Sequence, residues 1–392
     1  MMRLERLSLQ NWRCFAAINL PLGSFSLLAG PCGSGKTSLL DALCFLKDLA
    51  SGISLREAVS RRGGFSRLRN LEARFPATDV LLEVQVKGKE KRGWVYRLKF
   101  GEESGRLTVK EEMVWQSSSL IVRRPDLADQ KNPKRRAESI LYPLMATPPI
   151  ESLTSFFRSF RLENPLPPLW WQSALTPQLG PEANCLGLDF WERVAQTPER
   201  IRRVRLLHIS HALQSIIQAV GGLRVGMDRL GHWHLWVAFR QWRPRATWMV
   251  ERQLPDGLRR LIQLLWSVME GAAPLFIEEP EIGFHPEAVA KFPRIFKELG
   301  RLSHRPPQLI LTTHQPALIQ DRLVRKEEVS LLVPDKRGTR IARGAPKELV
   351  VAFLEAGTAM AEKIKPWLVS PEEPWLPLLV EGSRQKRPSP RN

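Results

Sequence analysis

The chain has 392 residues, enough to bury a sizeable core, and its 59 Lys and Arg outnumber its 40 Asp and Glu to give a formal net charge of +19. Such a charge favours a polyanionic partner, namely nucleic acid, an anionic membrane surface or an acidic protein, without choosing among them. The four cysteines form no C-x-x-C pair, which argues against a zinc site or a disulfide framework, and the lack of a signal-peptide core or of an apolar run of roughly 20 residues predicts a cytoplasmic protein without a membrane span.

The N-terminal residues predict two strands joined by a short turn. Residues 4–10 largely alternate apolar and polar side chains, which is typical of a half-buried strand. Residues 11–15, with the sequence N-W-R-C-F, turn the chain into a second strand over residues 16–20. A short apolar segment, residues 25–29, then predicts a buried strand.

A phosphate-binding loop follows that buried strand. Residues 30–37 read G-P-C-G-S-G-K-T, which matches G-x-x-x-x-G-K-[ST], and residues 37–46 predict a helix. In this order the loop amides and the helix N-terminus converge on one anion. We predict that Lys36 reaches the β- and γ-phosphates of ATP and that the Thr37 hydroxyl holds Mg²⁺. The ATP-binding residues predicted in this segment are Gly30, Pro31, Cys32, Gly33, Ser34, Gly35, Lys36, Thr37 and Ser38.

The middle of the chain predicts an antiparallel meander and then a less regular lobe. Three strands are expected over residues 79–87, 94–100 and 106–115, with glycine-containing turns between them. From residue 117 to about residue 181 prolines are frequent and the periodicity is weak. We therefore expect irregular structure with short helices in this lobe.

An arginine-rich helix and a tryptophan-rich sheet are predicted next. The helix is expected to start with Thr197 as its cap and Pro198 in its first turn, and to run to about Val220 with its arginines on a solvated face. Residues 222–248 alternate as strands. These strands interleave Trp233, Trp236, Trp242 and Trp248 with Arg240, Arg243 and Arg245. The favoured interpretation puts the tryptophans on the buried face of a sheet, and the alternative is a stacking platform for nucleic acid.

Two carboxylates and a histidine follow short apolar strands further along the chain. Residues 274–280, P-L-F-I-E-E-P, predict a strand that ends in an acid pair. We predict that Glu278 serves Mg²⁺ and that Glu279 orients the attacking water. The next predicted strand, residues 308–311, leads to T-T-H, so His314 is expected to contact the γ-phosphate.

The order of these motifs resembles a known family. Residues 254–260, L-P-D-G-L-R-R, precede an amphipathic helix over residues 261–269 and the acid motif I-E-E-P-E-x-G-x-H-P. Together with the phosphate loop and T-T-H-x-P, they resemble the ABC-class ATPases of the RecF, SMC and OLD type, above all the compact bacterial AAA family ATPases found in anti-phage defence or DNA repair. The opening N-W-R-C-F is similar to the N-F-[RK]-x-F start of that group. The resemblance covers roughly residues 1–50 and 250–345 closely, and the middle only in outline.

The resemblance implies an α/β fold, a P-loop NTPase with an ABC-ATPase-like head, an antiparallel β subdomain and a helical lobe. It places the head in residues 1–370 and a basic, Pro-rich tail in residues 371–392. Within the head the expected parts are a phosphate-loop lobe with the meander (1–116), an irregular and helical lobe (117–221), a part with strands, signature, acid motif and histidine (222–345), and a C-terminal helix (346–370).

The resemblance also implies a head that forms a homodimer around two ATP molecules and their Mg²⁺ ions. Each site would join the phosphate loop, acids and histidine of one subunit to the signature turn of the other. By this likeness Glu279 is the catalytic acid, His314 is the switch histidine, Gly257 belongs to the signature, and residues 281–285 face the dimer partner.

The sequence departs from the family pattern at several positions. Pro255 stands where the signature usually has a serine that meets the γ-phosphate of the partner subunit. The glutamine that couples the metal to the lobe has two candidates, Gln116 and Gln172. No long heptad arm, C-x-x-C hook or second acidic cluster interrupts the chain, so a full SMC tether and a fused OLD-type nuclease are not expected.

Three functions are compatible with these motifs. The first is a Mg²⁺-dependent ATPase whose ATP-driven dimerisation acts on DNA or RNA, which the positive charge favours. The second is an ATP-gated switch that holds or releases a separate effector protein, which Pro255 favours. The third and weakest is an ATPase subunit of a membrane transporter.

Overall fold

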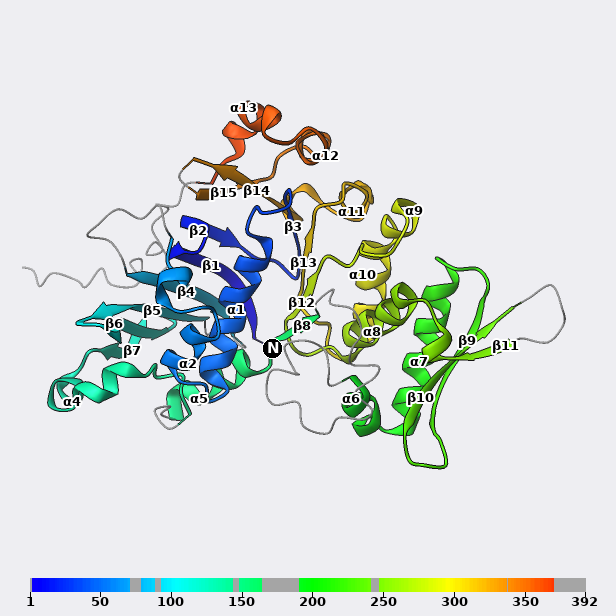
Figure 1. The fold of residues 1–392 in the computed structure, drawn as a ribbon, viewed down its shortest axis with the longest axis horizontal. Coiled ribbons are helices and arrows are strands. Elements are labelled where there is room, and N and C mark those ends of the chain that lie inside the picture. The colour runs from blue at the N-terminus through cyan, green and yellow to red at the C-terminus, as the bar shows by residue number, and fades with distance from the viewer. Residues whose placement is uncertain are drawn as a thin grey trace, which may run out of the picture.

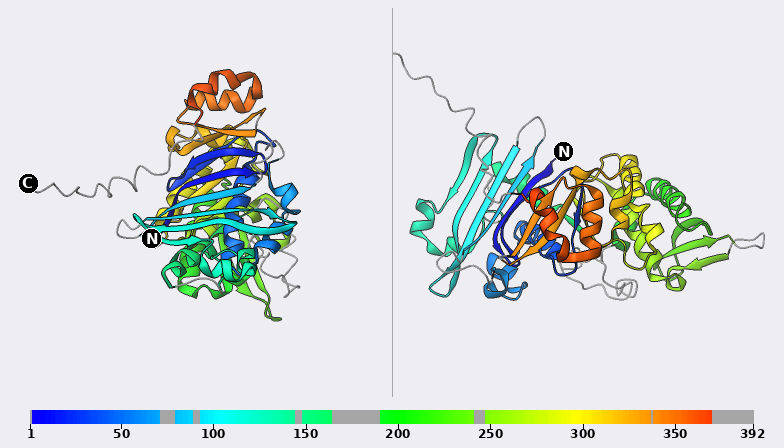
Figure 2. Two further views of the ribbon diagram at one scale, coloured as in Figure 1. Left: turned by 90° about the vertical axis from the view of Figure 1, so that its left-hand side faces the viewer. Right: turned by 90° about the horizontal axis from the view of Figure 1, so that it is seen from above.

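The computed structural model describes residues 2–70, 79–88, 93–143, 148–163, 190–240, 247–336 and 338–369. Three sheets organise these residues along the long axis of the molecule, with an antiparallel sheet at one end, a mostly parallel sheet in the centre and a small sheet at the other end (Figure 1). The view from above shows the same succession, with helices between the central and the small sheet (Figure 2). Within the described residues, no helix has the length and apolar character needed to cross a membrane.

The antiparallel sheet confirms the predicted N-terminal strands and the predicted meander. Its strand order is β2-β1-β4-β5-β6-β7. The strands are β1 (Arg3–Trp12), β2 (Phe15–Pro21), β4 (Val80–Lys87), β5 (Gly93–Glu103), β6 (Arg106–Gln116) and β7 (Ser119–Arg124). Asn11 and Arg13 adopt left-handed φ values of 55° and 46° at the turn between β1 and β2, which brings Trp12 opposite Phe15.

The central sheet carries the strands that precede the phosphate loop, the acid pair and the histidine. Its strand order is β15-β14-β3-β13-β12-β8, and all neighbours are parallel except the β14–β15 pair. The strands are β3 (Phe25–Ala29), β8 (Arg161–Glu163), β12 (Leu275–Glu278), β13 (Leu309–Thr313), β14 (Val329–Asp335) and β15 (Gly338–Arg343). Every residue of β3, β12 and β13 is buried, as expected for parallel strands that are covered on both faces.

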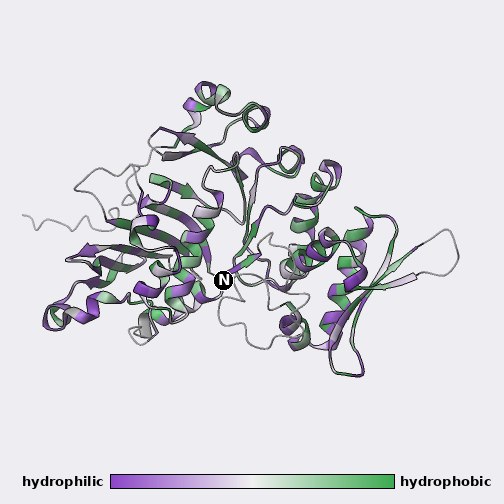
Figure 3. Ribbon diagram, viewed as in Figure 1, coloured by the Kyte–Doolittle hydropathy of each residue, from purple (hydrophilic) through white to green (hydrophobic). Residues whose placement is uncertain are grey.

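Alternate residues of the central strands face two different hydrophobic cores. Leu28 and Ile310 belong to the core shared with the antiparallel sheet and helix α1 (Lys36–Ala50). Leu27 and Leu311 belong to the core shared with helices α8 (Asp256–Glu270) and α10 (Phe292–Leu302). In Figure 3 both helices carry hydrophobic and hydrophilic bands. Helix α10 has one face on the core and one face in solvent, whereas α8 is buried on all sides from Arg260 to Met269.

The third sheet packs one face on helix α7 (Glu199–Gln214). Its strands, in the order β11-β10-β9, are β9 (Val220–Met227), β10 (Trp233–Phe239) and β11 (Thr247–Val250). The predicted helix start is wrong, because the N-cap is Pro198 and the Thr197 hydroxyl donates to the carbonyl oxygen of Arg193 (2.8 Å) instead of capping α7. The helix also ends at Gln214, because Val220 already belongs to β9.

The predicted burial of the tryptophans on this sheet is wrong for Trp236 and Trp248. Trp248 is 43% exposed and Trp236 is half-buried. Leu235 and Val237 fill the face of β10 that meets the core, so Trp236, which lies between them, points to the opposite face. Trp233 is also half-buried and lies against the guanidinium of Arg202 (4.6 Å). Trp242 lies outside the described residues.

The remaining helices are short. They are α2 (Leu55–Ser60), α3 (Phe65–Leu68), α4 (Leu127–Lys131), α5 (Pro148–Arg158), α6 (Phe190–Gln196), α9 (Pro286–Val289), α11 (Ala317–Gln320), α12 (Lys347–Ala356) and α13 (Ala361–Ile364). Buried Arg124 holds α4 against β6 through Asp129 (2.9 Å) and Glu112 (2.8 Å). Residues 164–189 and the predicted tail, residues 371–392, lie outside the described ranges.

Candidate functional site

The phosphate loop connects β3 to α1 at the carboxyl edge of the central sheet. The Gly30 amide donates to the carbonyl oxygen of Thr313 on the neighbouring strand (3.1 Å), which anchors the start of the loop. A Cβ on Gly30 would lie 2.4 Å from the Ser34 hydroxyl oxygen. Gly35 has φ 94°, and a Cβ there would lie 2.3 Å from Cys14 Sγ. The loop backbone therefore needs glycine at both positions.

The polar groups of the loop fit a phosphate ligand. Lys36 is buried, and its Nζ donates to the carbonyl oxygens of Gly30 and Pro31 (both 3.0 Å). In the part of the chain that the structure describes, the buried Ser34 hydroxyl has no hydrogen-bond partner. Phosphate oxygens could accept hydrogen bonds from both the Lys36 ammonium and the Ser34 hydroxyl.

The acid strand β12 ends beside the loop. Glu278, its last residue, lies opposite Thr312 of β13 and accepts a hydrogen bond from the Thr37 hydroxyl. Burial raises the pKa of Glu278, while the bond from Thr37 acts in the opposite direction. A carboxylate and a hydroxyl oxygen in contact are ligands of the kind that Mg²⁺ takes beside phosphate oxygens. Thr37 and Glu278 thus fit the predicted metal.

The side chain of Glu279 lies between the loop lysine and the histidine. Its Oε1 is 3.7 Å from Lys36 Nζ and 3.3 Å from His314 Nδ1. The residue has a left-handed φ of 43°, which costs a non-glycine residue free energy and persists only where neighbours hold it. One such restraint is the pair of bonds that the Glu279 amide makes to the backbone and hydroxyl oxygens of Thr312 (both 3.2 Å). The structure therefore brings together Lys36, Glu279 and His314 as the sequence predicts.

Sequence reasoning missed Glu281 as a group inside the site. It is 1% exposed, and its Oε1 accepts hydrogen bonds from the Thr313 hydroxyl (2.7 Å) and the His314 amide (3.1 Å). The same oxygen is 3.5 Å from His314 Nδ1. Burial raises the pKa of Glu281, and the Thr313 hydroxyl opposes that rise. Glu281 thus positions the histidine segment.

Sequence reasoning also missed Arg260, which connects the signature helix to the acid pair. Its Nη2 donates to the carbonyl oxygens of Glu278 (2.8 Å) and Glu279 (2.6 Å), and the side chain is largely buried. Burial lowers the pKa of Arg260 to about 10, so it stays charged at neutral pH. Arg260 is the second arginine of the motif L-P-D-G-L-R-R, so the sequence marks its position. Its partners could not be predicted, because they are backbone carbonyl oxygens that any residue would supply.

The remaining predicted residues lie around this centre. Gly257, in the first turn of α8, packs against Gly283 and Phe284, where an added Cβ would lie 3.2 Å from the Gly283 carbonyl oxygen. Pro255 is the N-cap of α8 and makes no side-chain cap bond. Gln116 ends β6 opposite Ser119 in the antiparallel sheet, and the other candidate glutamine, at position 172, lies outside the described residues.

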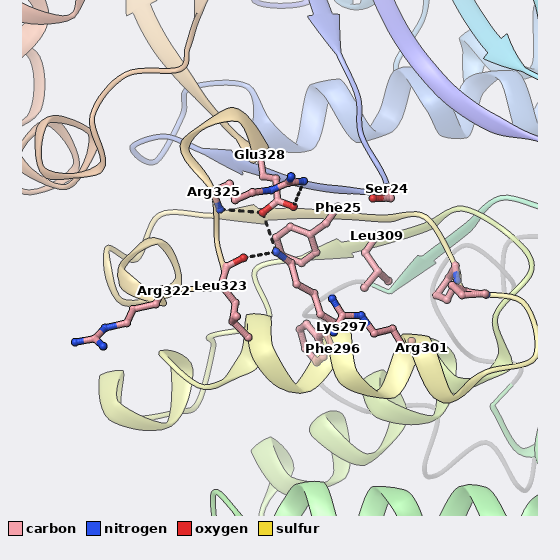
Figure 4. Close-up of a pocket in the computed structure, with 13 residues that line it drawn as sticks. Ser24, Phe25, Phe296, Lys297, Arg301, Leu309, Arg322, Leu323, Arg325 and Glu328 are labelled. Atoms are coloured by element: carbon pink, nitrogen blue, oxygen red, sulfur yellow. Dashed lines mark hydrogen bonds and ion pairs between the residues drawn. The ribbon is translucent and has the colours of Figure 1, made fainter.

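A cavity of about 500 Å³ lies at the opposite edge of the central sheet. Its lining includes Phe25 at the start of β3 and Leu309 at the start of β13, whereas the phosphate loop and His314 follow the ends of these strands. Figure 4 shows Lys297 inside it, where its Nζ donates to Glu328 (2.7 Å). None of the predicted site residues lines this cavity, so it is separate from the candidate site.

The chain is similar to two protein-family models and to several solved structures. A model described as "AAA domain" matches residues 6–134, and one described as "AAA domain, putative AbiEii toxin, Type IV TA system" matches residues 178–320. An SMC head bound to the C-terminal winged-helix domain of ScpA superposes with a TM-score of 0.53 at 12% identity, over 86% of this chain and 97% of that chain. The Smc head domain of Pyrococcus furiosus with an extended coiled coil, bound to the C-terminal domain of ScpA, gives 0.52 at 13% identity, over 93% and 100%.

The fold is that of an SMC head domain. The SMC head domain of Thermotoga maritima matches with a TM-score of 0.47 at 15% identity, over 87% of this chain and 98% of that chain. The sequence has no significant match among curated proteins. The predicted resemblance to ABC-class AAA ATPases and the predicted P-loop α/β fold are confirmed.

One prediction arises from the buried acid of the candidate site. Glu278→Gln should raise the melting temperature of the nucleotide-free protein at pH 7.5 by about 2 °C, because an ionised carboxylate is removed from a site that disfavours its charge. The folded pKa of Glu278 lies above the ordinary glutamate value of 4.5, so the gain should shrink as the pH falls to 4.5 and the carboxyl takes up a proton. Thermal unfolding at both pH values measures this. A variant that is less stable at pH 7.5 would show that the Glu278 charge is stabilised by its neighbours.

Proposed function

We propose that the chain is a Mg²⁺-dependent ATPase that binds ATP between two copies of the head, hydrolyses it, and acts on nucleic acid in DNA repair or anti-phage defence in the cytoplasm. The observation that supports this most is the convergence of three segments at one sheet edge. Lys36 follows β3, Glu279 follows β12 and His314 follows β13, and Glu279 lies within 3.7 Å of both other side chains.

Each side chain has a role that its contacts support. Lys36 would exchange the carbonyl oxygens of its own loop for the β- and γ-phosphates of ATP. Thr37 and Glu278 would hold Mg²⁺, which would neutralise charge on the phosphates when bound. Glu279 would orient the attacking water and accept its proton, and His314, held by Glu281, would contact the γ-phosphate.

The signature helix supports a dimeric site. Because Pro255 caps α8 without a side-chain bond, the first backbone N–H groups of this 15-residue helix are available to an anion. Gly257 lies against Gly283, so the signature and the segment at residues 281–285 form one continuous surface. A second copy that places its ATP on this surface would complete both sites.

The proposal is tested by the mass of the protein in solution. With ATP and Mg²⁺, light scattering should report twice the monomer mass, and phosphate release should accompany it. EDTA should abolish both, and ADP should leave a monomer. A mass that does not respond to nucleotide, while calorimetry detects ATP binding, would contradict the dimeric site and leave nucleotide binding intact.

Binding of nucleic acid is tested separately by its salt dependence. The net charge of +19 predicts a mainly electrostatic affinity that falls with a log–log slope of about −0.9 for each phosphate neutralised on duplex DNA. Fluorescence anisotropy from 50 to 300 mM salt measures the slope. Absence of binding at the lowest salt, with and without ATP, would favour the second candidate function.

That second candidate is an ATP-gated switch that holds a separate effector protein. Pro255 supports it, because a proline at the helix start offers neither a hydroxyl nor an amide donor to the γ-phosphate of a partner subunit. The SMC heads of similar fold are bound to domains of ScpA, and one matching family description names a toxin–antitoxin system. An effector would be recovered with the wild-type head in ATP and lost after hydrolysis.

A further inference from the structure

The small sheet at the end of the molecule presents a flat aromatic surface on the face turned away from α7. Arg224 of β9 lies opposite Trp236 of β10, and Trp248 of β11 lies opposite Ala238 of β10. These four residues share one face, because Leu235 and Val237 occupy the other face in the hydrophobic core. We name Arg224, Trp236 and Trp248 the Trp–Arg platform.

Small residues let the two indoles lie across the neighbouring strands. A Cβ on Gly226 would lie 3.4 Å from Cζ3 of Trp236, and a Cβ on Gly222 would lie 4.0 Å from Cη2 of Trp248. Both rings therefore reach over β9 at positions without a side chain. The Arg224 guanidinium is 5.0 Å from the Trp236 ring centre and 4.5 Å from the Trp248 ring centre, so it links the rings.

A groove of about 570 Å³ adjoins the platform along β9, which is an edge strand of this sheet. Its walls are α7 and the residues 221–225, and Arg224 belongs to both platform and groove. The charged and titratable side chains in its lining are Glu199, Arg202, Arg203, His211, Arg224 and Arg240. Glu199, the acid in this set, pairs with Arg203, so the groove has an excess of positive charge.

Two acids close to the platform, Asp228 just after β9 and Glu251 just after β11, have partners of their own. Asp228 accepts hydrogen bonds from the amides of Leu230 (2.8 Å) and His232 (2.9 Å) in the β9–β10 turn. Glu251 accepts from the Leu235 amide (3.0 Å), and both acids contact His234. The groove on the α7 side of β9 and the platform on the other side of the sheet therefore meet at the β9 edge, where Arg224 belongs to both.

We propose that the Trp–Arg platform and the groove beside it bind single-stranded nucleic acid. Two bases would stack on the indoles of Trp236 and Trp248 while the arginines of the groove hold the adjoining phosphates, the combination by which proteins bind single strands without sequence preference. A duplex keeps its bases stacked inside and cannot offer them to a flat aromatic face. An acidic polypeptide would match the arginines and leave the indoles unused. The inference rests on the proposal that this head acts on nucleic acid.

The test compares binding of a fluorescein-labelled 20-nucleotide oligothymidine with binding of a duplex of equal length, by anisotropy. Trp248→Ala should weaken single-strand binding about tenfold, since it removes one stacked base. Arg224→Gln should weaken it and also reduce the salt slope by about 0.7. Trp248→Phe keeps an aromatic face and should retain most of the affinity. If Trp248→Ala does not fold, the comparison of Trp248→Phe and Arg224→Gln with the wild type still tests the proposal.

Matched controls come from elsewhere on the surface. Trp367→Ala removes a tryptophan that is 37% exposed in the C-terminal part, and Arg294→Gln removes an arginine whose side chain is 66% exposed on α10. Both should bind within twofold of wild type.

Equal losses of affinity in the control variants would overturn the proposal, and so would tighter binding of the duplex than of the single strand. Polyglutamate gives a third test. If it displaces oligothymidine equally well from the wild type and from Trp248→Ala, the indole does not contribute to binding and the proposal fails. ATP-dependent dimerisation, measured on the same variants, should persist in each case. Absence of ATP-dependent dimerisation in the wild type would instead count against the proposed function.

Discussion

Replacing Glu279 by glutamine should leave ATP bound and reduce its hydrolysis by about 10²- to 10⁴-fold. The amide keeps the shape of the side chain but cannot accept a proton from water. The contact to Lys36 (3.7 Å) loses its ionic character, while Glu278 and Thr37 keep their own contact for the metal. The variant should therefore accumulate as an ATP-bound dimer, which calorimetry, phosphate release and light scattering measure together.

The control for this variant is Glu298→Gln on α10. That carboxylate is 51% exposed and pairs with Arg294 of the same helix, so its loss should leave hydrolysis unchanged. Wild-type turnover in Glu279→Gln would assign the catalytic acid to another residue. Glu281, which is buried and 3.5 Å from His314 Nδ1, would then be the group to replace next.

The fold could be predicted best where local pattern and tertiary environment agree. Residues 25–29 form a strand that is apolar except for Ser26, and the structure buries all of it between two cores. Strand β8 escaped prediction because its three residues carry no periodicity and exist as a strand only through pairing with β12. Thr197 was an acceptable cap by residue type, but its hydroxyl donates to the preceding turn of chain at Arg193.

In the candidate site, too, residues within sequence motifs could be predicted, whereas residues that act through tertiary contacts could not. Lys36, Glu279 and His314 each follow a recognisable strand, so sequence alone could place them at one sheet edge. Arg260 binds backbone carbonyl oxygens about one helix length along the chain, and such partners leave no signature in the sequence. The alternation of residues along β10 predicts that Trp236 lies on the face opposite Leu235 and Val237. Only the packing of α7 against the sheet decides which of the two faces is buried.

Lys36→Ala should lower the affinity for ATP by about 100-fold or more. The ammonium is the charged group of the loop, and each hydrogen bond from a charged group is worth about 1.5–3 kcal/mol. Its present acceptors are the carbonyl oxygens of Gly30 and Pro31 in the loop itself, so the same ammonium is within reach of a phosphate bound by the loop. Isothermal calorimetry with Mg²⁺ and ATP measures the loss.

Lys47→Ala is the matched control, because it removes the same charge from the last turn of the same helix, about 16 Å along α1. It should bind ATP as the wild type does. Lys36→Ala should also abolish ATP-dependent dimerisation while leaving the chain folded, since Nζ bonds only to its own loop and to Glu279 among the described residues. Unchanged affinity in Lys36→Ala would remove the phosphate loop from the site and, with it, the basis for assigning Glu279 and His314 to a γ-phosphate.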